Sequence, residues 1–321
     1  MGSTNRHFYA RGALLGAFVG DAAGATLEFI RRIPTGEDVD HAISLVGGGV
    51  WGTAPGQITD DGELSLSLAQ ALADSDVIDR EKVAANYRRW YESRPFDIGV
   101  ATRGAFGGNH DSNQSLAGQM EEAARLKNSE SKANGALMRI APLGIWSWKL
   151  DEETAAEAAR ADSRLSHPNA VCQHANAAYV AAIRHLMLNP GDGSGAIDAA
   201  FRVVSREDGA EVFQWLLDAR SGIGPSYYPQ AGYVRIAFTH AFRHLQMETP
   251  FYDALHETLR GGGDTDTNGC IVGGLIGALH GEGGIPAWMK QTVLNCETSL
   301  GRPRPDWLST RHVISLAERL F

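Results

Sequence analysis

A helix with one face free of side chains places the strongest constraint on how this sequence can fold. Residues 269–280 are almost all small or apolar, and Gly269, Gly273 and Gly277 recur at every fourth position. Residues four apart share one face of an α-helix, so this glycine face lets another backbone approach closely. The pattern predicts a central helix whose N-terminus opens at the middle of the domain.

Acidic and hydroxyl side chains stand directly before this helix. Residues 261–268 read GGGDTDTN, and an earlier stretch, PGQITDDGELSLSLAQAL, repeats the pattern with Thr59, Asp60 and Asp61 after a Pro/Gly loop. One interpretation is helix capping, because Thr59 or Asp60 is an ordinary N-cap, and Asp60 with Glu63 forms a variant of the capping box. One cap is enough for a helix, however, and GGGDTDTN offers five polar residues in succession.

A metal site is the second interpretation of the two acidic stretches. Neither stretch contains a Lys or Arg to neutralise its carboxylates, and burying an uncompensated carboxylate is costly, so bound cations are favoured. Carboxylates and hydroxyls without His or Cys are hard oxygen donors, which suit Mg²⁺ or Mn²⁺ rather than structural zinc. Two facing clusters could hold two ions about 3.5 to 4 Å apart, a spacing that serves to clamp a substrate and activate water.

The rest of the chain shows mainly helical patterning. Apolar residues recur at helical spacing, and strand-like alternation and long linkers are scarce. The segment GGGVWG, residues 47–52, matches a dinucleotide-binding pattern, but a loop, TAPGQITDD, follows it where a helix is required, so we reject that function. We expect one all-α domain over residues 1–321, a compact multi-helix fold around a central dinuclear metal site.

Composition and charge exclude several classes of partner. The net charge of −9, without a run of Lys and Arg, disfavours nucleic acid. The first apolar run is interrupted by Asp21 and Glu28, so we expect neither a signal peptide nor a membrane span. Three cysteines without CxxC spacing fit reduced thiols in a cytoplasmic protein. His167, Cys172 and His174 are close in sequence but lack a fourth ligand and the usual zinc spacing.

Five motifs follow one another between residues 12 and 281. They are GALLGAFVGDAAGATLEF, PGQITDDGELSLSLAQAL, SRPFDIGVATRGAF, the pair ANGALMRIAPLG and LSHPNA, and GGDTDTNGCIVGGLIGALHG. Taken together, these motifs resemble the ADP-ribosylglycohydrolase family, and most closely its dinitrogenase reductase-activating glycohydrolase branch. The sequence departs from the family pattern at Gly62, where Thr is usual, and at Ala133, where Gly is usual.

The resemblance implies an all-α hydrolase with two Mg²⁺ or Mn²⁺ ions. It would remove ADP-ribose from a modified protein side chain, most often arginine. The family's metal ligands carry over to Thr59, Asp60, Asp61, Asp264, Asp266 and Thr267.

The catalytic and substrate-binding residues are also predicted from this resemblance. We expect Asp97 beside the ribose as the acid/base candidate, Glu28 closing over the metal site, and Asp60 acting from among the metal ligands. The residues that resemble groups binding the ADP-ribose are Asn134, Gly135 and His167 at the diphosphate and Tyr233 at the adenine. The competing interpretations are that Tyr233 is a core residue and that His167 only caps a helix.

The expected reaction is metal-dependent cleavage of the N-glycosidic bond between ADP-ribose and arginine in a modified protein, with ADP-ribose as product. One alternative is a non-catalytic ADP-ribose-binding protein that lost turnover through Gly62. Another is a metal-dependent pyrophosphatase that cuts the diphosphate of ADP-ribose derivatives. The products distinguish them, because only the glycosidase releases intact ADP-ribose, whereas a pyrophosphatase releases AMP.

Overall fold

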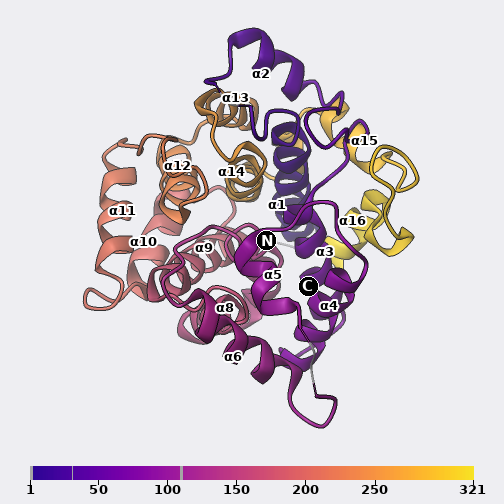
Figure 1. Cartoon of the computed structure of the whole chain (residues 1–321). Coiled ribbons are helices and arrows are strands. Elements are labelled where there is room, and N and C mark those ends of the chain that lie inside the picture. Colours follow the sequence, from indigo (N-terminus) through magenta and orange to yellow (C-terminus); the bar gives the residue numbers. More distant parts are fainter. Residues whose placement is uncertain (1–2, 31, 109–110) are drawn as a thin grey trace.

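Two helices lined with glycine lie side by side at the centre of the computed structural model, α14 (Thr265–His280) and α1 (Ser3–Gly24) (Figure 1). A Cβ built on Gly16 would lie 2.2 Å from the carbonyl oxygen of Gly273, and one on Gly20 would lie 1.9 Å from that of Gly269. Only glycine fits such backbone contacts. The predicted glycine face is therefore confirmed, and its partner is a second glycine ladder on the first helix of the chain.

The structure describes residues 3–30, 32–108 and 111–321. Within these ranges it contains sixteen α-helices and no β-strand, which confirms the all-α prediction. Besides α1 and α14, the α-helices are α2 (Gly36–Ile43), α3 (Asp60–Leu72), α4 (Arg80–Glu92), α5 (Val100–Phe106), α6 (Leu116–Asn128), α7 (Ala141–Trp146), α8 (Glu152–Arg164), α9 (Ala170–Leu188), α10 (Gly193–Val203), α11 (Ala210–Arg220), α12 (Val234–Gln246), α13 (Phe251–Gly261), α15 (Ala287–Leu294) and α16 (Val313–Glu318). Four 3₁₀ turns complete them, η1 (Ser147–Lys149), η2 (Glu282–Gly284), η3 (Asp306–Leu308) and η4 (Thr310–His312).

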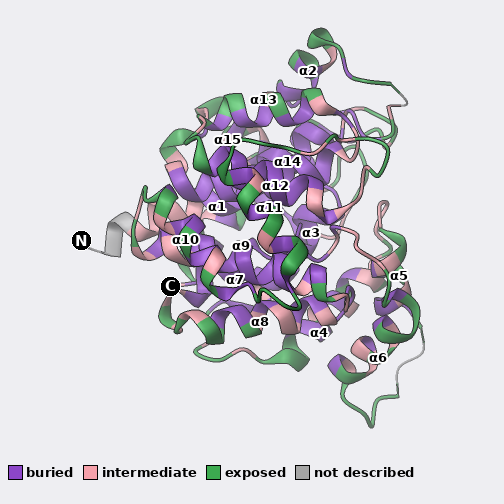
Figure 2. Cartoon of the chain, turned by 90° about the vertical axis from the view of Figure 1, so that its left-hand side faces the viewer, coloured by how far each residue is buried: buried purple, intermediate pink, exposed green. Residues whose placement is uncertain are grey.

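One large hydrophobic core holds these helices together, with members from Ala10 to Leu320. Figure 2 shows that α1, α9 and α14 are buried along most of their length, whereas α2 projects from the body and is mostly exposed at its tip. Since α14 is buried from Thr265 to Leu279, its N-terminus starts inside the protein rather than at the rim.

No helix in the described ranges is both long and apolar enough to cross a membrane.

The GGGVWG segment forms a loop. Its glycines Gly47, Gly48, Gly49 and Gly52 have positive φ angles, a backbone conformation that glycine adopts without strain. The next helix is α3, which begins only at Asp60. A dinucleotide fingerprint requires a helix directly after the glycines, so the structure confirms that this segment is not one.

Candidate active site

The N-termini of α3 and α14 meet inside the protein. The hydroxyl of Thr267 lies 3.4 Å from Asp61 Oδ2, and the hydroxyl of Thr59 lies 3.2 Å from the same oxygen. Asp61 and Thr267 are 206 positions apart in the chain, so the fold itself joins the two acidic stretches. The predicted metal ligands are buried except for Asp264, which is partly exposed.

Helix capping does not account for these acidic residues. Thr59 occupies the N-cap of α3 and Asp264 that of α14, but within the described ranges neither side chain makes a capping hydrogen bond. Glu63, which would complete a capping box, instead accepts a hydrogen bond from Trp90 Nε1 and forms an ion pair with Arg304. The capping interpretation of the first acidic stretch is therefore wrong, because its side chains bond to other parts of the protein.

Asp21 of α1 serves the N-terminus of α3, a role that sequence analysis missed. Its carboxylate accepts hydrogen bonds from the backbone N–H groups of Thr59 and Gly62, each at 2.9 Å, and from the Thr59 hydroxyl at 2.8 Å. A Cβ on Gly62 would lie 2.8 Å from Asp21 Oδ2. Gly62 therefore leaves space for Asp21. The sequence does carry a signal for this role, because Asp21 is the only charged residue in the apolar segment between Gly12 and Leu27.

Three of the predicted site residues form a compact acidic group. Carboxylate oxygens of Glu28, Asp264 and Asp266 all lie within 4.8 Å of one another. Burial and the carboxylates nearby raise the pKa of Asp266 well above its usual range, and they raise that of Glu28 to about 8. The protein alone thus holds these groups in a state that disfavours their negative charge, which is the environment a bound cation would reverse.

The site also contains a carboxylate oxygen that lacks a protein partner. Asp61 Oδ1 is buried and accepts no hydrogen bond from any described residue, and burial together with neighbouring Asp60 raises the pKa of Asp61 well above its usual range. An unsatisfied buried oxygen is destabilising unless it is paired. An oxygen-ligated divalent cation would satisfy it, and the carboxylates and hydroxyls here are the donors that Mg²⁺ and Mn²⁺ prefer. The residues present therefore fit such ions.

A cavity of about 760 Å³ opens over this acidic group. Its described lining contains no Lys or Arg. Asp97, in the segment between α4 and α5, lies in this lining, and burial raises its pKa. The predicted site residues that line the cavity are Glu28, Asp60, Asp97, Asn134, Asp264, Asp266 and Thr267. The structure thus places all three predicted catalytic residues in one cavity.

The predicted diphosphate-binding residues lie at different depths. Asn134 lines the cavity and donates a hydrogen bond from Nδ2 to Asp264 Oδ2 at 2.7 Å. Gly135 and His167 do not line the cavity, and a Cβ on Gly135 would be 2.9 Å from His167 Cε1. Burial lowers the pKa of the His167 side chain to about 3, so this imidazole is neutral at pH 7. The N-cap of α9 is Asn169, so the interpretation of His167 as a helix cap is wrong.

Tyr233 lies next to the cavity without lining it. It is half-buried before α12, with its hydroxyl 3.2 Å from Glu211 and its ring edge-on to Trp215 at 5.6 Å. The neighbouring backbone of Gly232, which does line the cavity, accepts a hydrogen bond from the Asn134 N–H at 3.1 Å. Packing thus explains the position of this ring, and its role at adenine stays a prediction.

Sequence analysis missed an aromatic cluster that contacts Glu28 through Trp51. Trp51 Nε1 donates a hydrogen bond to Glu28 Oε2 at 2.5 Å. The Trp51 ring makes edge contacts with Phe29 at 6.0 Å and with Phe96 at 5.9 Å. Phe29 has a φ of 58° and is 60% exposed at the cavity, a conformation that is strained for a bulky residue. The GGGVWG loop therefore presents Trp51 to a predicted catalytic carboxylate.

The fold and the site define an all-α protein with a buried acidic centre at the base of a cavity. The model of the ADP-ribosylglycohydrolase family matches residues 3–321. The chain therefore belongs to the ADP-ribosylglycohydrolase family, whose members are hydrolases.

Three relatives match over most of their length. A protein of Acanthamoeba polyphaga mimivirus named ADP-ribosyl glycohydrolase is 28% identical over 90% of this chain and 92% of its own. The ADP-ribosyl-dinitrogen reductase glycohydrolase of Rhodospirillum rubrum is 28% identical over 92% of this chain and 94% of its own. The ADP-ribosylarginine hydrolase Tri1 of Pseudomonas putida is 29% identical over 97% of this chain and 77% of its own. These similar identities do not single out the dinitrogenase reductase branch.

A solved structure supports the fold. A chain of an ADP-ribosylglycohydrolase-related protein complex superposes with a TM-score of 0.76, covering 99% of this chain and 98% of its own at 24% identity.

Proposed function

We propose that this protein is a metal-dependent hydrolase that cleaves the N-glycosidic bond between ADP-ribose and arginine in a modified protein. The observation that carries the proposal is the junction of α3 and α14, where Thr267 and Asp61 bring two acidic helix starts to the base of one cavity. Relatives named for activity on ADP-ribosylarginine and on ADP-ribosylated dinitrogen reductase support this choice of linkage.

The metal site would hold two Mg²⁺ or Mn²⁺ ions. Bound ions supply a more acidic water and orientation of the ribose hydroxyls. The residues that we propose as ligands are Thr59, Asp60, Asp61, Asp264, Asp266 and Thr267. Asp21 keeps Thr59 and the start of α3 in place through its three hydrogen bonds.

Cleavage requires a water, a proton acceptor and a proton donor near the scissile bond. Water adds its oxygen to C1'' of the ribose and gives up one proton, the C1''–N bond breaks, and the leaving guanidine nitrogen takes up one proton. Burial raises the pKa of Asp97, which favours proton exchange nearer neutral pH. We propose that Asp97 exchanges this proton and that Glu28, held by Trp51, closes the site beside it.

The remaining groups would bind the rest of ADP-ribose. Asn134 lies at the cavity wall against Asp264, and the Gly135 backbone lies next to it. Tyr233 stays a candidate for stacking on the adenine.

The test is product analysis with arginine-linked and serine-linked ADP-ribosyl peptides, each with and without Mg²⁺ or Mn²⁺. We expect intact ADP-ribose from the arginine-linked peptide only with metal. Release of AMP would instead identify a pyrophosphatase, and saturable ADP-ribose binding without any release would identify a binding protein.

A further inference from the structure

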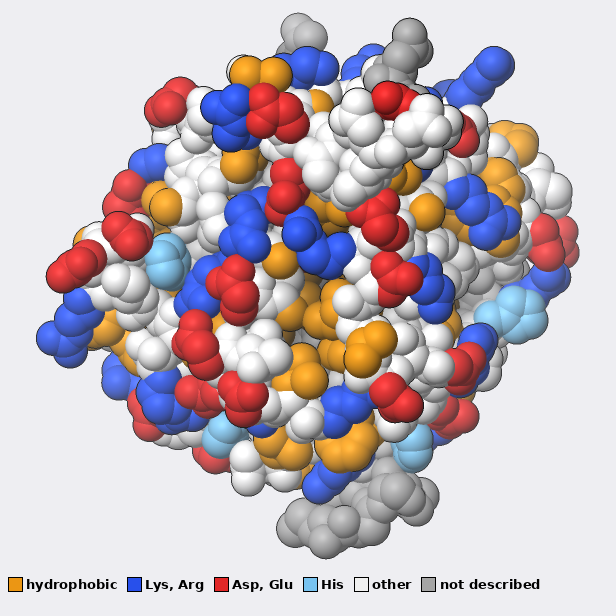
Figure 3. All heavy atoms as spheres, turned by 90° about the horizontal axis from the view of Figure 1, so that it is seen from below, with side chains coloured by type: hydrophobic (Ala, Val, Ile, Leu, Met, Phe, Trp, Pro, Cys, Tyr) orange, Lys and Arg blue, Asp and Glu red, His pale blue; other side chains and the backbone are white. Residues whose placement is uncertain are grey.

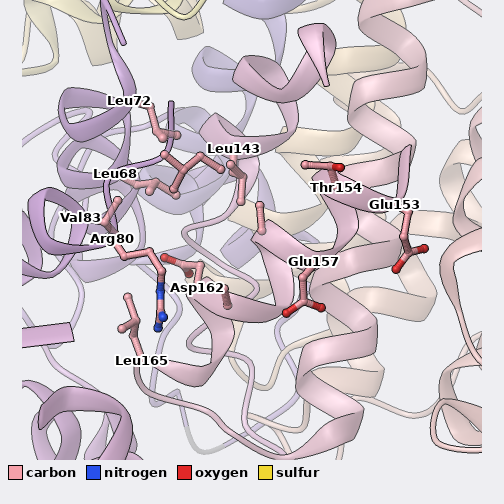
Figure 4. A pocket seen from close by; sticks show the side chains of 13 residues that line it. Leu68, Leu72, Arg80, Val83, Leu143, Glu153, Thr154, Glu157, Asp162 and Leu165 are labelled. Carbon is pink, nitrogen blue, oxygen red and sulfur yellow. The ribbon is translucent and has the colours of Figure 1, made fainter. Parts of the chain in front are cut away.

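A second cavity of about 510 Å³ lies between α3, α4, α7 and α8, lined by none of the residues that line the acidic cavity (Figure 4). Its walls are mainly aliphatic. The apolar side chains that line it are Leu68, Leu72, Ile78, Val83, Leu143, Ala158, Ala161 and Leu165. Figure 3, which views the molecule from below, shows hydrophobic side chains in a central hollow among interspersed acidic and basic ones. Concave apolar sites of this size are typical of small-molecule binding.

The charged side chains beside this cavity already pair with one another. Three arginines and three glutamates form a continuous series of ion pairs, and four of these pairs have N–O distances of 2.8 to 3.5 Å. Equal numbers of positive and negative charges make the series neutral. In order, its members are Arg80, Glu121, Arg164, Glu157, Arg160 and Glu153.

Among the described residues of the wall, Asp162 is the one buried charge, and it is paired as well. Asp162 accepts hydrogen bonds from the Tyr87 hydroxyl at 2.7 Å and from Arg139 Nε at 3.1 Å. Arg139 is fully buried and also donates to the carbonyl of Gly135 at 2.9 Å and to Ser166 Oγ at 2.8 Å. These contacts fix Asp162 and Arg139 in place, so the wall is preformed, and its described residues offer an entering molecule no unpaired charge.

A charged ligand would therefore lose its hydration without gaining a free counter-ion, whereas an uncharged apolar ligand loses little. We propose that this cavity is a binding site for an uncharged small molecule with an apolar body, such as a short aliphatic alcohol or a single-ring compound. This site is separate from the proposed hydrolase activity and does not depend on it.

The experiment uses the intact protein with the neutral fluorescent probe N-phenyl-1-naphthylamine. Competitors with one apolar chain and three different head groups, octan-1-ol, octanoate and octylammonium, then measure the charge preference. We expect one saturable site and displacement by octan-1-ol at a concentration about tenfold or more below that of either charged analogue. ADP-ribose should not displace the probe.

Substitutions in the wall test whether the probe binds in this cavity. Ala158 and Ala161 are half-exposed at its wall, so Ala158→Trp or Ala161→Phe fills the space without entering the core. Each should weaken probe binding about tenfold or more. Ala85→Trp, on an exposed position of α4 outside the lining, is the matched control and should bind like the unmodified protein.

Three results would overturn the proposal. They are the absence of saturable binding, equal displacement by all three competitors, and equal binding by folded Ala158→Trp and Ala85→Trp proteins. Circular dichroism checks that the variants are folded, and Ala161→Phe replaces Ala158→Trp if the latter is not.

Discussion

The Thr267 hydroxyl lies 3.4 Å from Asp61 Oδ2 and joins the first turn of α14 to the first turn of α3. Asp266 is next to Thr267, and Thr59 lies 3.2 Å from the same Asp61 oxygen. The acidic residues of both helices are therefore part of one site. Their close approach is sustained by the backbone contacts between α1 and α14, because Asp21 of α1 binds the start of α3.

Trp51→Phe should slow catalysis through Glu28. The substitution keeps an aromatic ring but removes the donor that lies 2.5 Å from Glu28 Oε2. A hydrogen bond to a charged group contributes roughly 1.5 to 3 kcal/mol, so we expect the rate to fall about 10- to 100-fold. ADP-ribose affinity, measured by calorimetry, should change little. Trp288→Phe, at an exposed position of α15, is the control, and an unchanged rate for Trp51→Phe would remove Trp51 from the site.

Gly62→Thr should destabilise the protein, although Thr is the usual family residue here. A Cβ at this position would lie 2.8 Å from Asp21 Oδ2, and overpacking costs about 1 to 3 kcal/mol. Urea unfolding measures the loss. Gly36→Thr is the matched control, because no atom lies within 4 Å of a Cβ built at that first position of α2. Equal stability of the two variants would mean that Gly62 is not needed to accommodate Asp21.

Asp97→Asn should lower the rate on arginine-linked ADP-ribose with little change in product affinity. The amide keeps the shape of the side chain but cannot exchange the proton or attract a guanidinium. This pattern identifies an interaction made chiefly in the transition state. Initial rates on arginine-linked and serine-linked peptides measure it. Faster release from the serine-linked peptide by the unmodified protein would refute the proposed linkage preference.

His167 predicts how stability changes on acidification. Burial, together with the charge of Arg139, lowers the pKa of its side chain from 6.5 to about 3. Between pH 6.5 and pH 3 the His167 side chain therefore binds more protons in the unfolded chain than in the folded protein. The contribution of neutral His167 to folding stability is present above pH 6.5 and is lost as the pH falls. At pH 5, which is about 1.5 pH units below the pKa of the unfolded chain, the free energy of unfolding should be roughly 2 kcal/mol lower than above pH 6.5.

His167→Gln isolates this contribution, because the other buried histidines remain in both proteins. Urea unfolding at pH 7.5 and pH 5 should show a smaller loss of stability on acidification for the variant. A variant with the same loss as the unmodified protein would mean that His167 is charged when folded.

The central features of the fold follow from local patterns in the sequence. The spacing of Gly269, Gly273 and Gly277 predicts a close backbone contact, and the structure places Gly20, Gly16 and Gly12 against them. Two acidic stretches without basic residues predict a buried acidic site, because a helix start needs only one cap. Both features depend on residues that are close together in the chain, so they can be recognised from the sequence alone.

The remaining features depend on contacts between distant segments. The sequence around Asp21 does not show that its carboxylate binds the backbone of Thr59. The sequence around Trp51 likewise does not show that its indole N–H donates to Glu28. The neutrality of the second cavity likewise arises from ion pairs between separate helices, such as Arg80 with Glu121. Such pairings cannot be derived from one sequence, since many partners are equally compatible with its pattern.

The metal centre also predicts a change in stability. Mg²⁺ or Mn²⁺ should raise the thermal midpoint, since a ligand at a hundredfold excess over its Kd stabilises the folded state by about 2.7 kcal/mol. Asp266→Asn should lose most of this effect and, without metal, be more stable than the unmodified protein, because the amide avoids the cost of burying a carboxyl group whose pKa is raised well above its usual range. Asp198→Asn, at an exposed position of α10, should keep the full effect.

The most direct test is a titration with Mn²⁺ followed by electron paramagnetic resonance. Asp61 and Asp266 lie in helix starts that meet, so we predict two Mn²⁺ ions per chain with a spin-coupled signal. Asp266→Asn should abolish the coupled signal while the circular dichroism spectrum stays helical. Binding of no ion, or of one isolated ion whose signal survives in Asp266→Asn, would contradict the dinuclear centre.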